Sequence, residues 1–507
     1  MIHPKTPIII GVGQITEKDK PLEVASSPLA LIEQATALAI EDAGLSRQAI
    51  THLSSLVVVK SFREPMRNTP EALANHLGAD DARQWLAPDG GNGPQYLVNR
   101  YAEEIFDGQE DFVLLCGSEA MATGRKIVKS GKKPQWSIES DKDAELLFAD
   151  RQMWNDHEFK HGIWQASHVY PLFENALRAH YGNTLDQHQT MMGELFSRLS
   201  EVAERSSHAW YPIKRSPQEI STATESNRYV GWPYTKFMNA MNQINQSASI
   251  LMTSVENAEK MGVDPSRWVF LHGCSDVTDV WNISYRENFH SSPSMRVMGE
   301  DALKMAGLTI GDIDHMDLYS CFPSAVQIAR NELGISPEDE RHLTVTGGLP
   351  FHGGAGNNYV MNSIAAMADQ LRSDRDSFGL VTANGGYISK HAAGIYSTKP
   401  VEEGWSRADS PVRELTPSDI KAPNFTENPE GKATIETYSV VFGRSGEPET
   451  GIVVGRLGET DDPSATRFLS LVDDDADMLL SMTQEEFVGR PGSVRQVGEV
   501  NRFAPDL

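Results

Sequence analysis

The chain has 507 residues, of which 39% are hydrophobic, enough for a sizeable core and for more than one domain. With 45 basic and 70 acidic residues the formal charge is −25, which argues against nucleic acid and anionic membranes because both are bound through clustered cations. We find no bilayer-spanning apolar run and no signal-peptide pattern, and the three cysteines are too scattered for a disulfide framework. We therefore expect a cytoplasmic globular protein.

Apolar strands alternate with helices in the first part of the chain. Residues 7–14 (PIIIGVGQ) form the first predicted strand, and a helix starts at residues 27–28 and ends before Gly44, where a left-handed cap is expected. The apolar segments 55–59 and 111–117 follow as buried strands. Strands without polar alternation, separated by helices, predict an α/β sheet that is covered on both faces.

One segment of the chain is repeated. AGLSRQAITHLSSL, from Ala43, matches AGLTIGDIDHMDLY, from Ala306, at a constant offset of 263 residues. Both copies follow a predicted helix and lead into a predicted strand, so the core is expected to be two similar halves. A Trp- and His-rich insertion lies between them.

From these patterns we expect five segments. They are an N-terminal half (1–125), an inserted loop domain with its return (126–245), a C-terminal half (246–398), a proline-rich linker (399–430) and a β-rich C-terminal domain (431–507).

The last segment is predicted to be a small barrel. Strand-like runs cover residues 432–443, 449–458 and 467–472, a short helix covers 478–487, and a final strand-like run covers 493–503. A five-stranded barrel fits this order best.

Two motifs resemble metal sites, but a structural interpretation is favoured for each. HEFKH (157–161) matches the zinc pattern H-E-x-x-H, in which two imidazoles bind zinc and the glutamate activates water. Gly162 follows at once and no third ligand has a standard spacing, so a partly structural loop is favoured. DDDAD (473–477) lacks the glycine and glutamate of a calcium loop, and a solvated turn before a helix is favoured. We expect no metal.

Three glycine-rich runs, GGNGPQ (90–95), TGGLPFHGGAGNNY (346–359) and TANGGY (382–387), occur between buried strands. None has a phosphate-loop pattern. Together they predict tight loops where backbone amides approach one shared ligand, the alternative being independent structural turns.

At these runs the chain resembles the thiolase superfamily over residues 5–398, in particular the sterol-carrier-protein branch and the thiolase-like proteins of type 1 that carry an added C-terminal domain. LLCGSEAMA (114–122), YPLFENALRAHYG and PYTKFMNAMNQINQSASILMTS carry the likeness. The resemblance implies a duplicated five-layered α/β core with an inserted loop domain, plus a small barrel-like C-terminal domain.

The family's four catalytic positions are changed in this chain. GGNGPQ aligns to the C-x-S-G motif with Gly90 at the nucleophilic cysteine, and Tyr319 stands where the second motif has His or Asn. GGLPFHGGA places Gly354 at the base histidine, with His352 two residues earlier, and NGG places Asn384 at the acid/base cysteine. Since glycine supplies neither thiolate nor base, ordinary thiolysis is not expected.

The resemblance implies a cleft lined by the polar residues Asn92, Tyr319, Ser320, His352, Asn357, Asn358 and Asn384. Tyr319 as proton donor or acceptor and His352 as base would suit aldol or retro-aldol chemistry on a CoA thioester. The alternative is that Tyr319 only fills the space of a lost histidine. Cys321, beside the second motif, is interpreted as a packed thiol.

Coenzyme A is expected as ligand or substrate, without a tightly bound cofactor. In thiolases the loop domain holds its nucleotide end, which makes Lys214, Arg215 and Lys236 candidates for phosphate contact. Three functions stay open: a nominal acetyl-CoA acetyltransferase of lipid metabolism with degraded or altered thioester chemistry, a CoA-thioester lyase, and a non-catalytic module that presents acyl-CoA to another protein. A homodimer is expected unless the added domain blocks the usual interface, which would leave a monomer.

Overall fold

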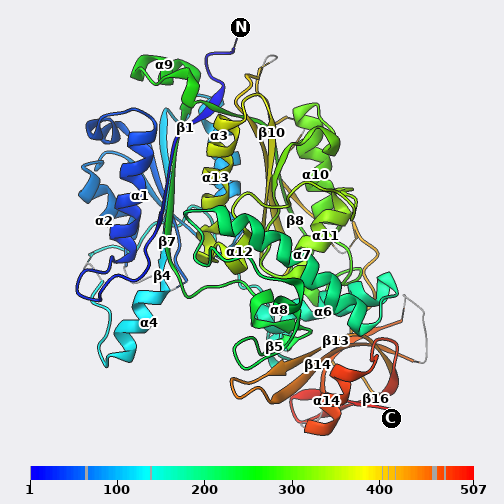
Figure 1. Cartoon of the computed structure of the whole chain (residues 1–507). Coiled ribbons are helices and arrows are strands. Elements are labelled where there is room, and N and C mark those ends of the chain that lie inside the picture. The colour runs from blue at the N-terminus through cyan, green and yellow to red at the C-terminus, as the bar shows by residue number, and fades with distance from the viewer. Residues whose placement is uncertain are drawn as a thin grey trace.

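The computed structural model describes residues 2–62, 67–136, 140–401, 404–408, 410, 412–416, 418–458, 465–472 and 475–506. Helical layers and sheet layers alternate across its main body, and a small barrel closes one end (Figure 1). None of the described helices has the length and apolar composition needed to cross a bilayer.

Each half of the main body contributes one part of the sheet. The strands run in the order β3-β2-β4-β7-β1 and then β8-β11-β10-β9. The first half contains β1 (Pro7–Thr16), α1 (Pro28–Asp42), β2 (Ser55–Val59), α2 (Thr69–Leu77), β3 (Arg83–Ala87), α3 (Gly93–Phe106), β4 (Phe112–Ala120), α4 (Met121–Lys129), β7 (Asn245–Ser254) and α9 (Val255–Met261). The second half contains β8 (Val269–Thr278), α10 (Pro293–Ala306), β9 (His315–Asp317), α11 (Pro323–Glu332), α12 (Gly348–Phe351), α13 (Tyr359–Ser373), β10 (Phe378–Gly385) and β11 (Lys390–Ser397).

The five layers follow from this order. Helices α1 and α2 cover one outer face, α10 and α11 cover the other, and α3 and α13 pack against each other between the two parts of the sheet (Figure 1). The predicted apolar strands are therefore buried on both faces, as their lack of polar alternation requires.

The two halves repeat the same packing. Gly44 and Gly307, paired in the sequence repeat, both have left-handed backbone, with φ of 69° and 67°, just after α1 and α10. A Cβ on Gly11 of β1 would lie 2.2 Å from the carbonyl of Ala39, and one on Gly273 of β8 would lie 2.1 Å from that of Ala302. The duplication read from the sequence is thus present in three dimensions.

The insertion is mainly helical. It contains α5 (Asp156–Lys160), α6 (Ala166–Tyr181), α7 (Leu185–Arg205), α8 (Pro217–Ser221), β5 (Tyr229–Trp232) and β6 (Tyr234–Thr235). The two short strands join the sheet of the C-terminal region, because β5 pairs with β13.

The C-terminal region forms a closed five-stranded barrel with the circular order β13-β14-β15-β17-β16. Its elements are β13 (Gly431–Phe442), β14 (Pro448–Leu457), β15 (Arg467–Val472), α14 (Ala476–Gln484), β16 (Pro491–Val497) and β17 (Val500–Pro505), and a short β12 (Arg413–Glu414) precedes them. The single final strand predicted over 493–503 is wrong. It is a hairpin that turns at Gly498, whose φ is 64°.

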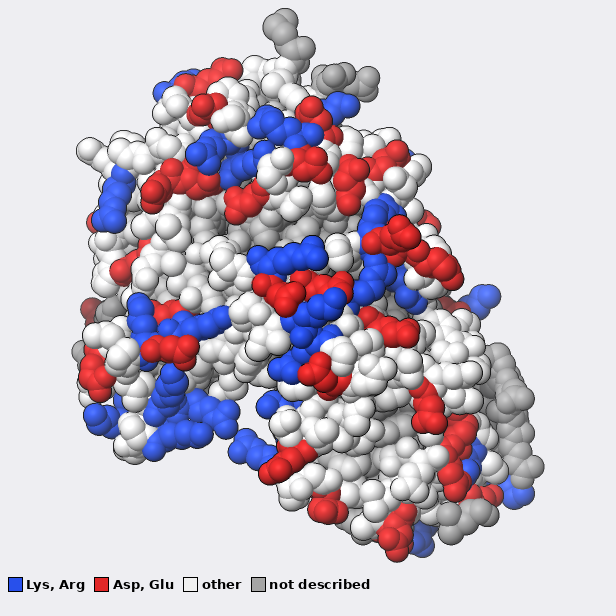
Figure 2. Space-filling view, in the orientation of Figure 1, with Lys and Arg blue, Asp and Glu red and all other residues white. Residues whose placement is uncertain are grey.

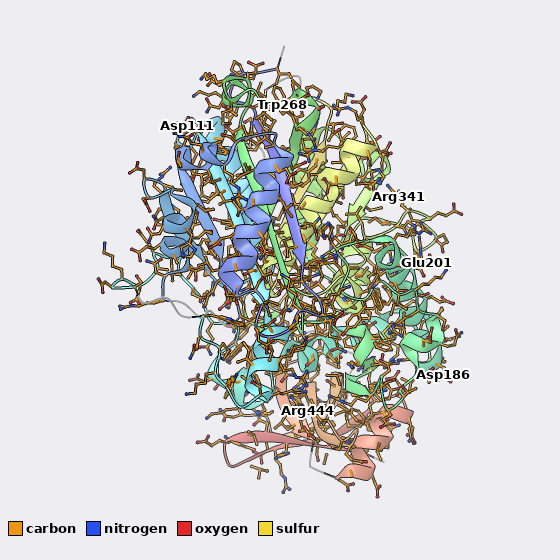
Figure 3. All side chains as sticks on the ribbon, turned by 60° about the vertical axis from the view of Figure 1, so that its left-hand side comes forward. Asp111, Asp186, Glu201, Trp268, Arg341 and Arg444 are labelled. Atoms are coloured by element: carbon orange, nitrogen blue, oxygen red, sulfur yellow. The ribbon has the colours of Figure 1, made fainter. Side chains whose placement is uncertain are left out.

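The barrel lies at the opposite end of the main body from the start of β4. In Figure 3, Arg444 of the barrel lies at the bottom of the molecule, whereas Asp111, just before β4, and Trp268 lie near the top. The insertion lies between the barrel and the second half of the main body, since α6 packs against both β13 and α11.

A buried cation joins the barrel to the main body. The guanidinium of Arg467, which has no exposed surface, donates to the carbonyls of Ser284, Arg286 and Glu287 and pairs with Glu436 at 2.6 Å. Its donors thus satisfy backbone acceptors that would otherwise be buried without partners.

The HEFKH segment serves the same junction. Glu158 is fully buried. It accepts hydrogen bonds from the side-chain amide of Asn282 and from the backbone N–H and the hydroxyl of Ser284. His161 Nε2 accepts the Asn501 amide of β17 at 2.9 Å. Of the DDDAD run, residues 473–474 lie outside the described residues, and Asp475 caps α14.

Replacing Arg467 with Met should uncouple the barrel. The change leaves buried Glu436 with one cation fewer and three carbonyls unpaired, so we expect a loss of about 3–5 kcal/mol and a lower midpoint of urea unfolding. The control is Arg490→Ala, which removes a partly exposed pair with Glu485 and the contact of Arg490 with the Phe487 ring and should cost less than about 1 kcal/mol. Equal effects of the two changes would contradict this account of the junction.

Candidate functional site

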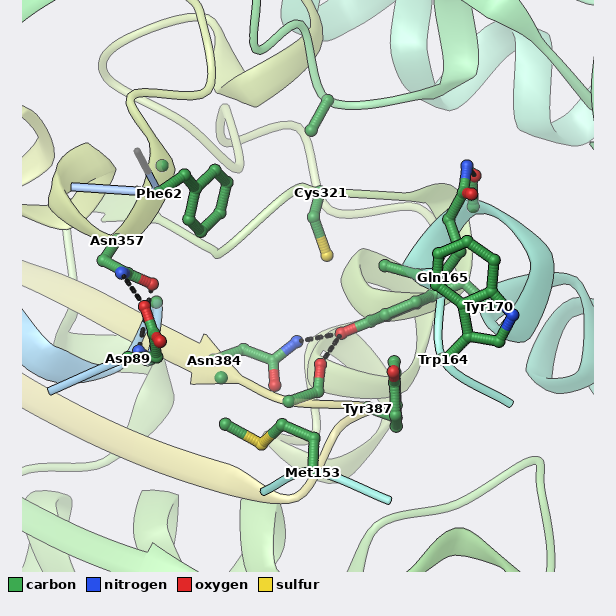
Figure 4. A pocket seen from close by; sticks show the side chains of 18 of the residues that line it. Phe62, Asp89, Met153, Trp164, Gln165, Tyr170, Cys321, Asn357, Asn384 and Tyr387 are labelled. Atoms are coloured by element: carbon green, nitrogen blue, oxygen red, sulfur yellow. Dashed lines mark hydrogen bonds between the residues drawn. The ribbon is translucent and has the colours of Figure 1, made fainter. Parts of the chain in front are cut away.

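The three glycine runs meet around one cavity of about 1290 Å³ at the start of α3 and the end of β10 (Figure 4). The first run contributes Gly90 and Gly91, the second contributes Gly356 and Asn357, and the third contributes residues 384–387. The volume exceeds the common size of small-molecule pockets, so the cavity has room for a large ligand.

The floor of the cavity is polar. A Cβ on Gly91 would lie 2.3 Å from the Tyr319 hydroxyl, so this phenol occupies the space beside the start of α3. Asn384 donates to the Tyr170 hydroxyl at 3.0 Å, and that hydroxyl donates to the Gly386 carbonyl at 3.0 Å (Figure 4). Burial raises the pKa of both tyrosines, so both stay protonated hydrogen-bond donors at neutral pH.

One side of the floor is fixed by Asp89. Its carboxylate accepts from the Asn357 amide and pairs with Lys60, both at 2.9 Å, and Asn357 in turn accepts the Gly90 amide at 3.0 Å. Burial lowers the pKa of Lys60, but its hydrogen bonds to Asp89 and Asp150 outweigh this and raise it overall. The loop before α3 is therefore held by a lysine that keeps its charge.

The second glycine run is organised by a buried carboxylate. Asp317 accepts hydrogen bonds from the hydroxyls of Thr344, Thr346, Ser363 and Tyr359. Burial raises the pKa of Asp317, and the hydrogen bonds from these donors lower it by less, so the pKa stays above its usual value. Since the donors come from both the loop and α13, Asp317 fixes the course of the chain that leads to the cavity wall.

Aromatic side chains surround the opening of the cavity. Phe62, Phe159 and Trp164 line it and remain 50%, 52% and 46% exposed. The charged residues that line it are three aspartates and one arginine: Asp89, Asp150, Asp156 and Arg151. The interior thus favours an apolar or neutral polar chain over a phosphate.

A segment without regular structure forms one wall. Residues 150–154 line the cavity. Asp150 pairs with Lys60 at 3.0 Å, Trp281 donates to the Gln152 carbonyl at 2.6 Å, and Arg151 lies 4.1 Å over the Trp281 ring. Hydropathy and spacing gave no signal for this wall.

Of the seven polar residues expected in the cleft, the structure places Tyr319, Asn357 and Asn384 on the cavity. Asn92 precedes α3, and its Oδ1 would lie 2.6 Å from a Cβ on Gly90. Ser320 and Asn358 are buried next to the lining, where they bond to the Leu349 amide and the Gly117 carbonyl. These three support the wall without facing the cavity.

His352 lies elsewhere. It lines a separate hollow of about 680 Å³ together with His208 and His342, and burial lowers its pKa to about 3. The structure therefore does not bring the predicted base to Tyr319, and a histidine with so low a pKa is a weak base at neutral pH.

The residues that the sequence aligns with the family's catalytic positions lie on or next to the cavity. Gly90 is on the cavity, and a Cβ on Gly354 would lie 2.8 Å from the side-chain oxygen of Asn242, which also lines it. Cys321 is on the cavity too, but burial raises its pKa to about 12. It is a protonated thiol at neutral pH and no nucleophile.

The predicted phosphate contacts lie outside the lining. Lys214 is exposed and pairs with Glu201, Arg215 stacks 4.1 Å over the Phe237 ring, and Lys236 is exposed just before the lining residue Asn239.

A denser basic cluster was not among the residues predicted from the sequence. It consists of the exposed side chains of Arg125, Lys126, Lys129, Lys132 and Lys133, on α4 and just after it. None of them forms an ion pair with another residue that the structure describes. Figure 2 shows Lys and Arg gathered over α4, beside a notch that separates this lobe from the barrel.

Comparison with known proteins agrees with this geometry. A monomeric SCP2-thiolase-like protein type 1 from Mycobacterium smegmatis is 33% identical and superposes with a TM-score of 0.83, over 99% of this chain and 100% of its own. The chain belongs to the thiolase-like protein type 1 family. The family model for the additional C-terminal domain of these proteins matches residues 414–499, and a thiolase C-terminal domain-like model matches residues 275–398.

More distant structures share only the fold. They include an Ltp2-ChsH2(DUF35) aldolase (18% identity, TM-score 0.56, 78% of this chain and 98% of that chain) and an acetyl-CoA acetyltransferase from Syntrophomonas wolfei (14%, 0.56, 79% and 100%). The dimeric peroxisomal thiolase of Saccharomyces cerevisiae is equally distant (14%, 0.56, 79% and 99%). No curated protein matches the sequence. The predicted thiolase fold and its barrel-like addition are confirmed.

In this type 1 thiolase-like protein, Gly91→Ala should disturb the floor of the cavity. The new Cβ would overlap the Tyr319 hydroxyl and lie 2.5 Å from the Asn384 carbonyl, so we expect a loss of about 1–3 kcal/mol. The measurement is urea unfolding. Gly93→Ala is the matched control, because a Cβ there meets no atom within 4 Å and should leave stability unchanged or slightly raised. A Gly91→Ala protein as stable as the wild type would disprove the close approach of Tyr319.

Proposed function

We propose that the protein binds an acyl-CoA in the cavity and does not catalyse thiolysis. The observation that carries this proposal is the cavity itself, which lies at the start of α3 with Gly90, Gly354 and Asn384 at the family's catalytic positions. A thiolysis cycle needs a thiolate and a base, and a protonated Cys321 supplies neither.

The charge distribution supports an extended ligand with two unlike ends. Inside the cavity the aromatic and amide side chains suit an acyl group and its pantetheine arm. Phosphates would be repelled there by the aspartates and need cations outside. The basic cluster of α4 meets this need, because α4 starts beside β7, where Ala122 donates to the Ile244 carbonyl at 3.1 Å, close to the lining residue Asn242.

Coenzyme A should therefore raise the melting temperature, since a ligand at about one hundred times its Kd adds about 2.7 kcal/mol. We expect a shift with CoA, acetyl-CoA and a longer acyl-CoA, and none with zinc. The double change Lys126→Glu and Lys129→Glu should weaken CoA binding roughly tenfold, measured by titration calorimetry, and should leave pantetheine, which carries no phosphate, unaffected.

The matched control is the double change Lys214→Glu and Lys236→Glu, which reverses the charge at the two positions in the same way. A larger loss from this pair would move the phosphate site to the positions first predicted. The absence of any shift with every thioester would end the proposal of CoA binding.

A second candidate is a carbon–carbon lyase that acts on a CoA thioester. Tyr319 supports this candidate, because its side chain lines the cavity and its hydroxyl stays protonated at neutral pH. A lyase reaction that uses such a proton donor needs no acyl-enzyme. One of the proteins of similar fold is described as an aldolase, which agrees with this candidate. His352 does not take part, because it lies in another hollow.

If the protein is a lyase, Tyr319→Phe should abolish the release of a carbonyl product from a 3-hydroxyacyl-CoA, measured by mass spectrometry. The same change should leave the Kd for CoA within about a factor of two, since one neutral hydroxyl contributes little binding energy. Turnover that persists in Tyr319→Phe would rule out this role, and thiolysis of acetoacetyl-CoA by the wild type would overturn the leading proposal.

Oligomeric state remains a prediction. The relative from Mycobacterium smegmatis is described as monomeric.

A further inference from the structure

Lys390 lies beside Gly90, the residue that the sequence predicts at the position of the family's nucleophile. It opens β11 opposite Gly385, and its Nζ donates to the Asp89 carbonyl at 2.7 Å. A Cβ on Gly90 would lie 2.8 Å from this Nζ, and one on Gly385 would lie 3.0 Å from its Cε. Because residue 90 has no side chain, the lysine amine takes up the space that a nucleophile at this position would use.

The surroundings favour an uncharged amine. Burial lowers the pKa of Lys390 to about 8, against the pull of Asp150 and Asp89. Both carboxylates are already paired with Lys60, and the nearest ring is that of Trp281, whose centroid lies 5.4 Å from Nζ. Near pH 7.5 such an amine is neutral about two hundred times more often than an ordinary lysine.

Two lysines beside the same carboxylate therefore differ in role. Lys60 bonds directly to Asp89 and Asp150, and its pKa is raised. Lys390 bonds to a backbone carbonyl instead, which accepts a hydrogen bond without a full counter-charge. On the other side of the glycine pair the Tyr319 hydroxyl lies against Gly91, so an amine and a phenol flank residues 90–91.

We propose that Lys390, whose amine lies directly beside the lining residues Gly90 and Gly385, is a nucleophile that forms an imine with the ketone of a 3-oxoacyl thioester bound in the cavity. The Nζ lone pair forms a bond to the keto carbon, the carbonyl oxygen leaves as water, and the two amine protons account for the hydrogens of that water. No oxidant or reductant is needed. The choice of a thioester as substrate rests on the proposed function, whereas the nucleophilic role of the Lys390 amine does not.

The test uses acetoacetyl-CoA and sodium cyanoborohydride with the full-length protein, followed by peptide mass mapping. We expect a reduced adduct on Lys390 that needs both reagents, that free CoA competes away, and whose rate rises with pH through about 8. Acetyl-CoA, which has no ketone, should give none. Lys390→Arg should remove the adduct, whereas Lys60→Arg, which keeps the charge beside Asp89, should retain it.

Labelling confined to exposed lysines such as Lys132 would overturn the proposal, as would acylation of Lys390 without reductant, which marks attack on the thioester. If acetoacetyl-CoA raises the melting temperature but gives no adduct, the imine fails and the proposed function stands. If no CoA compound binds, 2,4-pentanedione tests the amine alone. An adduct on Lys390 would then keep the nucleophile and discard the thioester, and no adduct would discard both.

Discussion

Everything in the cavity depends on the lack of side chains at Gly90 and Gly91. The Tyr319 phenol approaches one of these residues and the Lys390 amine approaches the other, each closer than a Cβ would permit. Asn357 then reaches the Gly90 amide, and Asp89 holds Asn357. A side chain at either residue would displace the groups that now lie there. The two glycines and the polar groups around them are therefore one linked arrangement.

The barrel is an integral part of the molecule. Arg467 and Glu436 share a buried pair whose remaining donors satisfy main-chain carbonyls near residues 284–287. β5 of the insertion extends the barrel sheet, and Thr437 donates to the Leu172 carbonyl of α6. Because α6 also carries Tyr170, the barrel supports a helix that lines the cavity. The added domain thereby fixes one wall of the candidate site.

Much of the framework was predictable from the sequence. Residues 56–59 are apolar throughout and belong to a strand buried on both faces, and Gly44 and Gly307 mark the same helix end in two copies. The final hairpin was missed because residues 493–503 keep a strand-like composition through Gly498, and only Gly498 and Glu499 separate the two strands. The wall at residues 150–154 was missed because its position depends on contacts with Lys60 and Trp281, which are remote in sequence.

The sequence by itself determined the α/β class, the duplication and the barrel, because these follow from local periodicity and from the repeated segment, and the residue types at the motif positions predict that ordinary thiolysis is absent. Only the tertiary structure decided which polar residues share the cavity. It placed Tyr319, Asn357 and Asn384 together, moved His352 to another hollow, and brought Lys390 to Gly90. The physical reason is that burial and proximity, which set both reach and pKa, arise from chain segments that meet only after folding.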